Sequence, residues 1–279
     1  MKNTFDYHEA ILKLREFFQE KKGFIEVPAQ SRTSILAACE DPKNITQFTF
    51  DAFDYPLPQT GQMWLEYELL KNPTFPGFFC VTTSYRNEPK PIEGRHDKIF
   101  PMFEFEAKGS IEDLKQLEEE LLIFLGFGKP KFVEYERICH EWNIDEVSAE
   151  HEERMNLEIG PVICLEKFPL RTDPFWNMKR VSRDSDLFEK VDVILYGMET
   201  IGSAERSIDV QQMREHFLTI SEGQYAELLF EKFGRSRVEE ELDEYFGFKM
   251  IQRFGGGIGV TRLVRAMYLA GLMEDKVIC

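Results

Sequence analysis

Hydrophobic and polar residues follow two different periods along the chain, and the period predicts the type of each element. Residues 6–22 carry apolar side chains at helical spacing, and Gly23 follows a lysine-rich last turn, so we expect an amphipathic helix that ends at this glycine. The next stretch, GFIEVPAQ, alternates apolar and polar residues. It contains Pro28, which is tolerated at the edge or end of a strand but not in a central one.

The middle of the chain predicts short strands and two helices. The longer helix begins with a capping box, because Ser110 is followed by Asp113 three positions later, and it is closed by Gly126 or Gly128. A shorter helix covers MWLEYELLKN. The expected strands cover residues 46–53, 78–85 and 99–106.

The pattern is weaker between residues 129 and 186, where only 162–168 is typical of a strand. The elements expected after it are a strand over FEKVDVILYG, a polar loop over GSAERSID, a helix over about 209–233, an acidic segment and a glycine-rich run before a last helix. No repeat or linker-like tract divides the chain, and strands do not alternate regularly with helices. We therefore expect one α+β domain over residues 1–279, built on a mostly antiparallel sheet.

Composition narrows the class of protein. With 43% hydrophobic and 30% charged residues the chain is typical of a globular protein. No apolar run approaches the ~18 residues of a membrane helix, and the N-terminus lacks a signal-peptide core, so we expect a cytoplasmic protein. The 5 cysteines form no CxxC pair and predict reduced thiols. The net charge of −16 argues against DNA binding and against broad contact with RNA.

The most concentrated set of functional side chains lies in SYRNEPKPIEGRHDKIFPMFEFE, residues 84–106. Two strands enclose a Pro/Gly loop, and Arg86, Arg95 and His96 converge on this hairpin. Arginine suits bidentate recognition of phosphate or carboxylate, and an aromatic side chain beside it can stack on a purine. A surface hairpin with Arg–Glu salt bridges is an equally good interpretation of the spacing alone.

Two further patterns indicate a functional site less strongly. In GGGIGVTRLVRAM, glycines permit close approach of a ligand or of another element, and Arg262 lies in the first turn of the following helix, where an anion is favoured. A glycine bend that packs a helix on the sheet explains this run as well. Asp192 and Glu199 flank a strand and turn, where two carboxylates can hold Mg²⁺ together with phosphates, although such pairs usually lie in solvent.

Taken together, these three features resemble the catalytic core of class II aminoacyl-tRNA synthetases, in their aspartyl/asparaginyl branch. The stretch ending in Pro28 is similar to motif 1, YRNEP…GRH…FPMFEFE to motif 2, and GGGIGVTRL to motif 3. The resemblance covers nearly the whole chain and implies a class II antiparallel sheet flanked by helices. It also implies a homodimer that forms through the motif 1 region.

The resemblance also implies an ATP-dependent activity in which an amino acid is joined to AMP. Arg86 would contact the α-phosphate, Phe100 would stack under adenine, and Arg262 would close over its other face. Asp192 and Glu199 would hold Mg²⁺. The implied ATP-binding residues are Arg86, Glu88, Arg95, His96, Phe100, Gly257, Gly259 and Arg262, with Arg86 and Arg262 as the catalytic pair.

The amino acid is implied by a second set of positions. Aspartate enzymes of the family place a lysine where this chain has Leu65, and Leu65-Glu66 is the pattern of the asparagine enzymes, as is Ala38-Cys39-Glu40. Arg206 would reach the side-chain oxygen, and Glu66 would accept from an amide and repel aspartate. The implied amino-acid-binding residues are Glu40, Gln59, Gln62, Leu65, Glu66, Glu104, Ser203 and Arg206.

Two departures bear on the acceptor of the activated amino acid. Motif 3 has Thr261 where glutamate is usual, and the chain begins at the motif 1 helix without the N-terminal β-barrel that binds the anticodon in this branch. We therefore expect asparagine, aspartate or a close analogue to be activated and passed to ammonia or another amine. Charging of tRNA without an anticodon domain, and a non-catalytic sensor of an amino acid or nucleotide, are the alternatives.

Overall fold

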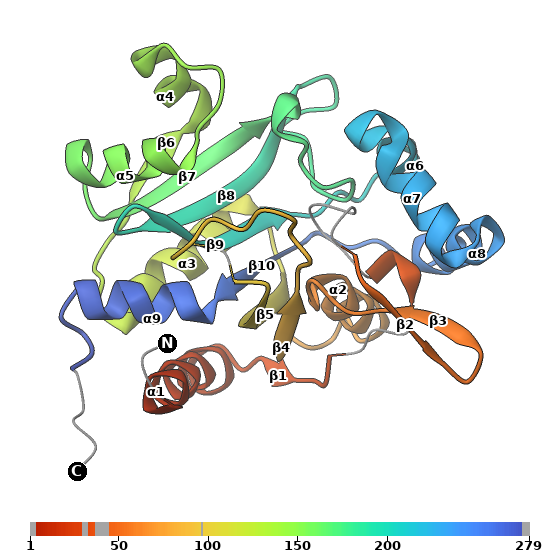
Figure 1. Ribbon diagram of the computed structural model, residues 1–279, viewed down its shortest axis with the longest axis horizontal. Coiled ribbons are helices and arrows are strands. Elements are labelled where there is room, and N and C mark those ends of the chain that lie inside the picture. The colour runs from red at the N-terminus through yellow and green to blue at the C-terminus, as the bar shows by residue number, and fades with distance from the viewer. Residues whose placement is uncertain (1–3, 30–32, 37–44, 96, 275–279) are drawn as a thin grey trace.

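An eight-stranded sheet runs through the molecule, which in this computed structural model is described over residues 4–29, 33–36, 45–95 and 97–274 (Figure 1). From one edge to the other its strands are β1 (Ile25–Glu26), β4 (Gly77–Tyr85), β5 (Ile99–Lys108), β10 (Arg253–Gly259), β9 (Met198–Glu205), β8 (Leu187–Leu195), β7 (Val162–Pro169) and β6 (Lys131–Glu134). The outermost pairs, β1–β4 and β6–β7, are parallel, and all pairs between them are antiparallel. The predicted α+β fold on a mostly antiparallel sheet is confirmed.

Helices cover both faces of this sheet. They are α1 (Thr4–Arg15), α2 (Gln62–Lys71), α3 (Ile111–Leu125), α4 (Tyr135–Trp142), α5 (Ala149–Glu158), α6 (Val210–Thr219), α7 (Gln224–Phe233), α8 (Arg235–Phe246) and α9 (Val260–Leu269). Short 3₁₀ turns occupy Ser34–Leu36, Leu170–Thr172 and Ile220–Gly223. A separate hairpin pairs β2 (Gln47–Phe50) with β3 (Phe53–Pro56).

The main core lies on one face of the sheet, where α1, α3 and α9 pack. Every second residue of a strand points to the same face, so Phe254 and Ile258 of β10 join this core. Gly255 and Gly257 lie on the opposite face of the sheet. On the opposite face α4 and α5 cover the β6–β7 end, and α2 with α6, α7 and α8 forms another cluster beside β4 (Figure 1). The middle strands of that face carry the candidate site.

Most predicted elements of the first half are confirmed. The strand expected over 46–53 is instead part of a hairpin, because Asp51 and Ala52, with φ values of +50° and +64°, form a turn between β2 and β3. The helix that starts the chain is regular to Arg15 and then continues as π-helix over Glu16–Lys21 before Gly23, whose φ is +70°. The capping box is present, because the backbone N–H and hydroxyl of Ser110 both donate to the Asp113 carboxylate, at 2.7 and 2.8 Å. These bonds lower the pKa of Asp113. Gly126, with φ +100°, ends this helix.

The predicted polar loop over GSAERSID is wrong. Residues 202–205 belong to β9, in the middle of the sheet, and Ser203, Glu205 and Arg206 are almost wholly buried. Their polar groups are satisfied by distant partners; for example, Glu205 pairs with Lys179 at 2.8 Å. Because these partners lie elsewhere in the sequence, the local polarity indicated solvent where the fold supplies hydrogen bonds.

The predicted helix over about 209–233 is two helices. Between α6 and α7, Ser221, Glu222 and Gly223 have φ values of +51°, +57° and +83°. Three successive residues in the left-handed region cannot continue an α-helix, so the chain turns between them. The acidic segment that follows is helical as well, as α8.

The described residues contain no helix that is both long and apolar enough to cross a membrane. Three cysteines within them, Cys80, Cys139 and Cys164, are free and buried. Burial raises the pKa of each thiol, so these cysteines are poor nucleophiles.

Candidate active site

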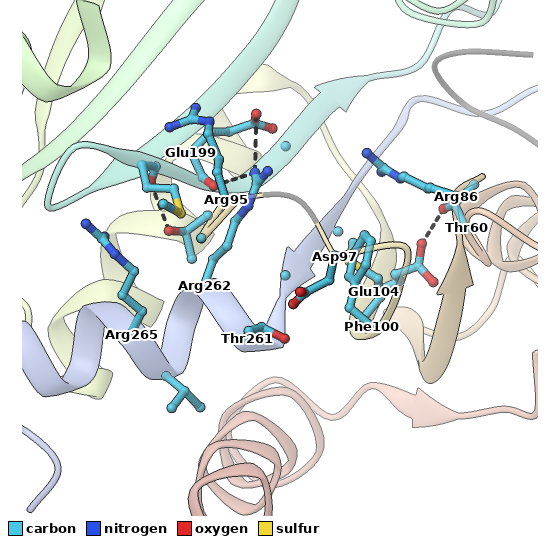
Figure 2. Close-up of a pocket in the computed structure, with 18 of the residues that line it drawn as sticks. Thr60, Arg86, Arg95, Asp97, Phe100, Glu104, Glu199, Thr261, Arg262 and Arg265 are labelled. Carbon is cyan, nitrogen blue, oxygen red and sulfur yellow. Dashed lines mark hydrogen bonds and ion pairs between the residues drawn. The ribbon is translucent and has the colours of Figure 1, made fainter. Parts of the chain in front are cut away.

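A cavity of about 750 Å³ lies over the middle of the sheet, bounded by the segment between β4 and β5, the start of α2 and the polar side of α9. Figure 2 shows its wall. Most of the residues that the sequence singled out line it, together with Thr261: Gln62, Arg86, Glu88, Arg95, Phe100, Glu104, Glu199, Gly257, Gly259 and Arg262. The hairpin, the glycine run and one of the two acids therefore meet in one place.

The floor of the cavity is built from glycine. In the sheet register, Gly257 of β10 lies between Glu104 of β5 and Gly202 of β9. An added Cβ at Gly257 would lie 2.9 Å from the Cε atom of Met102, so a larger residue would push into the cavity wall. These glycines leave the backbone open to a ligand, as the sequence suggested.

The two preceding glycines serve packing instead. An added Cβ at Gly255 would lie 1.7 Å from a carboxylate oxygen of Glu106, and one at Gly256 would lie 2.7 Å from the Cβ atom of Ser203. Close approach to a ligand and close packing were offered as alternatives for this run. The structure has both, at different residues of the same strand.

Arginines stand at both ends of the cavity (Figure 2). The guanidinium of Arg86 lies 5.5 Å from the ring centroid of Phe100, within cation–π range. Arg262 donates to the backbone carbonyl of Glu199 at 2.8 Å, and its side chain is 26% exposed. A polyanion in this cavity would meet positive charge at each end, which the expected ATP site requires.

Arg95 reaches the cavity from the loop between β4 and β5, but it is already paired. It donates to Glu152 of α5 at 2.7 Å, and the other oxygen of Glu152 accepts from the backbone N–H of Glu199 at 2.7 Å. Glu152 thus ties this loop to β9. Neighbouring His96, expected to act with Arg95, lies outside the described residues.

The two candidate metal ligands face the same point of the sheet. A register shift after Val193 inserts an extra residue into β9, which brings Glu199 to the side of Gly202. A Cβ at Gly202 would lie 3.3 Å from Oε1 of Glu199 and 3.6 Å from Oδ1 of Asp192. Asp192 also pairs with Lys190.

The Asp192 and Glu199 carboxylates fit a cation that is also coordinated by phosphate oxygens. No group of three or more His, Cys, Asp or Glu side chains able to hold a metal ion occurs among the described residues. Two carboxylates and phosphate ligands are the set that Mg²⁺ uses with nucleotides.

Glu104 is the acid at the floor of the cavity. It accepts hydrogen bonds from the Thr60 hydroxyl, from the Gly61 N–H at 2.7 Å and from Thr82 at 2.7 Å. Its burial raises its pKa, although these donors and Arg86 favour the ionised form. Glu104 therefore fixes the start of α2 against β5 and adds a polar group to the cavity.

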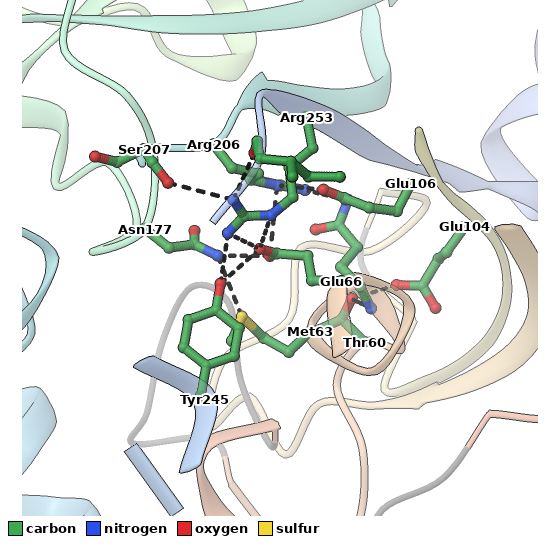
Figure 3. A network of polar contacts seen from close by, with 12 residues as sticks. Thr60, Met63, Glu66, Glu104, Glu106, Asn177, Arg206, Ser207, Tyr245 and Arg253 are labelled. Atoms are coloured by element: carbon green, nitrogen blue, oxygen red, sulfur yellow. Dashed lines mark hydrogen bonds and ion pairs between the residues drawn. The ribbon is translucent and has the colours of Figure 1, made fainter. Parts of the chain in front are cut away.

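Beside this floor lies a buried cluster of charges (Figure 3). Glu66 accepts from Arg253 at 2.7 and 3.0 Å, from Tyr245 at 2.8 Å and from Asn177 at 2.6 Å. Arg206 lies 3.5 Å from Glu66, and its nearest acid is Glu106, at 3.2 Å. The expected neighbours Glu66 and Arg206 are thus brought together, behind the wall of the cavity.

Three other expected amino-acid-binding residues do not line the cavity. Leu65 is wholly buried in an apolar cluster with Leu69 and Phe78. Ser203 faces α3, where it contacts Glu118 at 2.6 Å. Gln59 is buried, and its backbone carbonyl accepts from Ser84. Glu40 lies outside the described residues.

Sequence reasoning missed several residues of this region. Arg265 lines the cavity and lies one helical turn after Arg262, a spacing that could have revealed it. Glu152 lies in the segment where the pattern was weak. The partners of Glu66 gave no local signal, because they come from three separate segments: Asn177, Tyr245 and Arg253.

Comparison with known proteins shows the family of the chain. Residues 1–274 match the family described as tRNA synthetases class II (D, K and N). A relative from Dictyostelium discoideum, the cytoplasmic asparagine–tRNA ligase, is 25% identical over 315 residues. That alignment covers 92% of this chain but only 44% of the relative, so the chain spans less than half of the relative's length.

Solved structures show the same fold. The asparaginyl-tRNA synthetase of Pyrococcus horikoshii in complex with asparaginyl-adenylate matches with a TM-score of 0.76 at 20% identity, over 94% of this chain and 64% of that one. The aspartyl-tRNA synthetase of Entamoeba histolytica matches with a TM-score of 0.69 at 17% identity, over 94% and 54%. The expected class II sheet flanked by helices is therefore confirmed.

Proposed function

The chain belongs to the class II tRNA synthetases of the D, K and N group, and from this we propose that its cavity joins ATP to an amino acid of the asparagine or aspartate type. The observation that carries the proposal is the placement of Arg86, Phe100 and Arg262 around one cavity whose floor is glycine. The product would be an aminoacyl-adenylate. We further propose that residues 1–279 act as one catalytic domain.

The reaction needs charge neutralisation more than a nucleophilic side chain. A carboxylate oxygen of the amino acid attacks the α-phosphorus, the new O–P bond forms, and the bond to pyrophosphate breaks. Two anions must approach one another, so Arg86 beside the α-phosphate and Arg262 beside the outer phosphates would lower the barrier. Asp192 and Glu199 would hold Mg²⁺, which adds positive charge to the phosphates.

The proposal is tested by amino-acid-dependent exchange of labelled pyrophosphate into ATP. We expect exchange with at least one amino acid of the asparagine/aspartate type, and none without an amino acid. Absence of exchange across all twenty amino acids would contradict it and favour a sensor that binds without reacting. The retained arginines count against a sensor, because binding alone does not require a stabilised transition state.

For the acceptor we propose ammonia or another small amine. Its support is the net charge of −16, which works against contact with nucleic acid. The Dictyostelium relative is named an asparagine–tRNA ligase, which supports the alternative, charging of tRNA. Incubation of the adenylating protein with ammonium, small amines and total tRNA separates the two, since only the true acceptor will discharge the product.

Two further proposals concern the setting of the enzyme. A homodimer through the motif 1 region is supported by β1, an edge strand whose Ile25 is exposed, and analytical ultracentrifugation would test it. A cytoplasmic location is supported by the name of the Dictyostelium relative and is tested by cell fractionation.

A further inference from the structure

Lys190 is a third charged group at the carboxylate pair of Asp192 and Glu199. It lies two residues before Asp192 on β8, so both side chains point to the face of the sheet that carries the cavity. Its Nζ atom donates to Oδ2 of Asp192 and lies 3.7 Å from the ring centroid of Phe168. The side chains of Lys190 and Asp192 are only 21% and 11% exposed. The ammonium is therefore fixed beside this carboxylate.

The two oxygens of Asp192 face different neighbours. Oδ2 accepts from Lys190, whereas Oδ1 faces Gly202, where an added Cβ would lie 3.6 Å from Oδ1 and 3.3 Å from Oε1 of Glu199. A cation over Gly202 would therefore meet one oxygen of each acid. Lys190 and Asp192 also line a second cavity of about 370 Å³, which shares Glu199 with the first cavity. Lys190 thus occupies one oxygen of Asp192 while the other is directed at the candidate Mg²⁺ position.

The ammonium offsets one of the two negative charges that a metal ion would meet at this pair. An ion at Oδ1 of Asp192 would lie roughly 6 Å from Nζ of Lys190, on the other oxygen of the same carboxylate. Even with the dielectric constant of water, repulsion between a single and a double positive charge at roughly 6 Å weakens binding by about tenfold. The hydrogen bond also orders the short Asp192 side chain, but that effect is smaller. Lys190 should therefore disfavour a divalent ion that arrives alone.

A nucleotide reverses the sign of this effect. The triphosphate of ATP carries more negative charge than one Mg²⁺ neutralises, so the complex of the two is still an anion. Lys190 attracts an anion, as do the arginines of the cavity. The same ammonium therefore opposes the ion alone and favours the ion that arrives with phosphates.

We infer that Lys190 is a positioning residue of the metal site, which makes the Asp192–Glu199 pair accept Mg²⁺ as its nucleotide complex and disfavour the ion alone. The inference rests on the proposed function, because it takes Asp192 and Glu199 as the metal ligands. Lys190 acts through Asp192, by fixing which oxygen faces the cavity and by offsetting its charge. ATP and the ion should therefore bind with positive coupling.

The test uses Mn²⁺, which takes the same oxygen ligands and whose electron paramagnetic resonance signal in solution is lost on binding. In Lys190→Met, which removes the charge, we expect Mn²⁺ without nucleotide to bind about tenfold more tightly than in the wild-type protein. Titration with the preformed Mn²⁺ complex of a non-hydrolysable ATP analogue should instead show equal or weaker binding by this variant. Asp192→Asn, added to Lys190→Met, should abolish the tenfold gain.

Lys115→Met is the matched control. Lys115 of α3 lies on the other face of the sheet, where its side chain is 20% exposed, pairs with Glu166 at 2.7 Å and lies 5.0 Å from the ring centroid of Phe132. Its loss should leave Mn²⁺ binding unchanged. Lys190→Arg, which keeps the charge, should retain wild-type binding. Lys190→Gln also removes the charge and takes the place of Lys190→Met if that variant does not fold.

Equal affinity of the wild-type protein and Lys190→Met for Mn²⁺ without nucleotide would overturn the inference and leave the proposed function intact. A gain that persists with Asp192→Asn would also overturn it, because the ion would then bind elsewhere. Absence of Mn²⁺ binding in every variant, with and without the nucleotide, would contradict Asp192 and Glu199 as metal ligands and the inference with them. Pyrophosphate exchange by the same proteins then shows separately whether the proposed adenylation holds.

Discussion

At the open end of the cavity the Arg262 side chain is 26% exposed and lies 3.7 Å from the Glu199 carboxylate, whereas in the buried cluster Arg253 is 0% exposed and lies 2.7 Å from Glu66. The first pair is loose and hydrated, so an incoming phosphate can replace the acid. The second pair cannot be separated without leaving a charge in a medium of low dielectric. One region therefore has charges available for the reaction, and the other has charges fixed in advance that shape the pocket.

This difference in burial predicts which substitutions should affect stability and which should affect the reaction rate. Charges that are already paired and buried contribute to folding, and their loss is felt with or without substrate. Charges that are available to a ligand contribute chiefly to the stability of the transition state.

The largest effect is expected from Arg253→Leu, which leaves Glu66 buried without its cation. We expect the free energy of unfolding, measured with urea, to fall by about 3–5 kcal/mol. The double variant Glu66→Leu/Arg253→Leu should recover at least half of this loss, because Glu66 and the cation nearest to it are removed together. A single variant with a loss below about 1 kcal/mol would show that the cluster is hydrated in solution.

Around the cavity, Arg86→Ala and Arg262→Ala should each lower kcat/KM for adenylation, measured by pyrophosphate exchange, by an amount that corresponds to about 2–4 kcal/mol of lost transition-state stabilisation. The unfolding free energy of Arg262→Ala should change by less than about 1 kcal/mol, as expected for a partly exposed and loosely paired charge. Arg137→Ala, in an exposed pair on α4, provides a control for loss of positive charge. Undiminished adenylation in either cavity variant would contradict its assignment.

A third prediction concerns Glu118, a buried acid of α3 outside the cavity. Ser203 lies 2.6 Å from Oε1 of Glu118 and 2.9 Å from the carbonyl of Val191. The Ser203 hydroxyl has one proton to share between these two acceptors, so it compensates the burial of the Glu118 carboxylate only in part. Burial raises the pKa of Glu118 to about 8.

A raised pKa means that the folded protein binds this proton more tightly than the unfolded chain. The stability that Glu118 contributes is complete below about pH 4.5 and is lost as the pH rises to about 8, by about 1.4 kcal/mol per pH unit. Glu118→Gln should remove that slope from urea unfolding curves, while Glu112→Gln, exposed on the same helix, should not. An unaltered slope in Glu118→Gln would mean that Glu118 is ionised in the folded state.

The smallest effect is expected from Glu152→Gln, which keeps the size of the side chain but removes the charge that holds Arg95 and one of the two acceptor oxygens. We expect KM for ATP to rise by a few fold, about 1 kcal/mol, with kcat little changed. Steady-state exchange kinetics at varied ATP would measure it. A fall in kcat without a change in KM would instead place Glu152 among the groups that act in the transition state.

The sequence predicted elements whose signals are local. The capping box at Ser110 and the alternation in β5 depend on neighbours a few residues apart, and both are present. The β9 strand was missed because Ser203 and Arg206 find their partners on α3 and β5, far along the chain. Polarity alone cannot reveal that a polar residue will be buried when its partner is distant.

The distinction between local and distant partners also separates the site residues that could be predicted from those that could not. Motif residues such as Arg86 and Gly257 lie in short stretches with recognisable chemistry, and they line one cavity. Leu65 was expected to face substrate, but the helical position that it occupies turns into an apolar cluster. The partners of Glu66 come from three segments, so its buried contacts could be seen only in three dimensions.

A crystal structure with Mg²⁺ and a non-hydrolysable ATP analogue would test whether Arg86 and Arg262 contact one triphosphate across this cavity. We predict adenine against Phe100, with the phosphates contacted by the guanidinium groups of both arginines. A nucleotide bound elsewhere, or one in this cavity with either arginine turned away from its phosphates, would contradict the account.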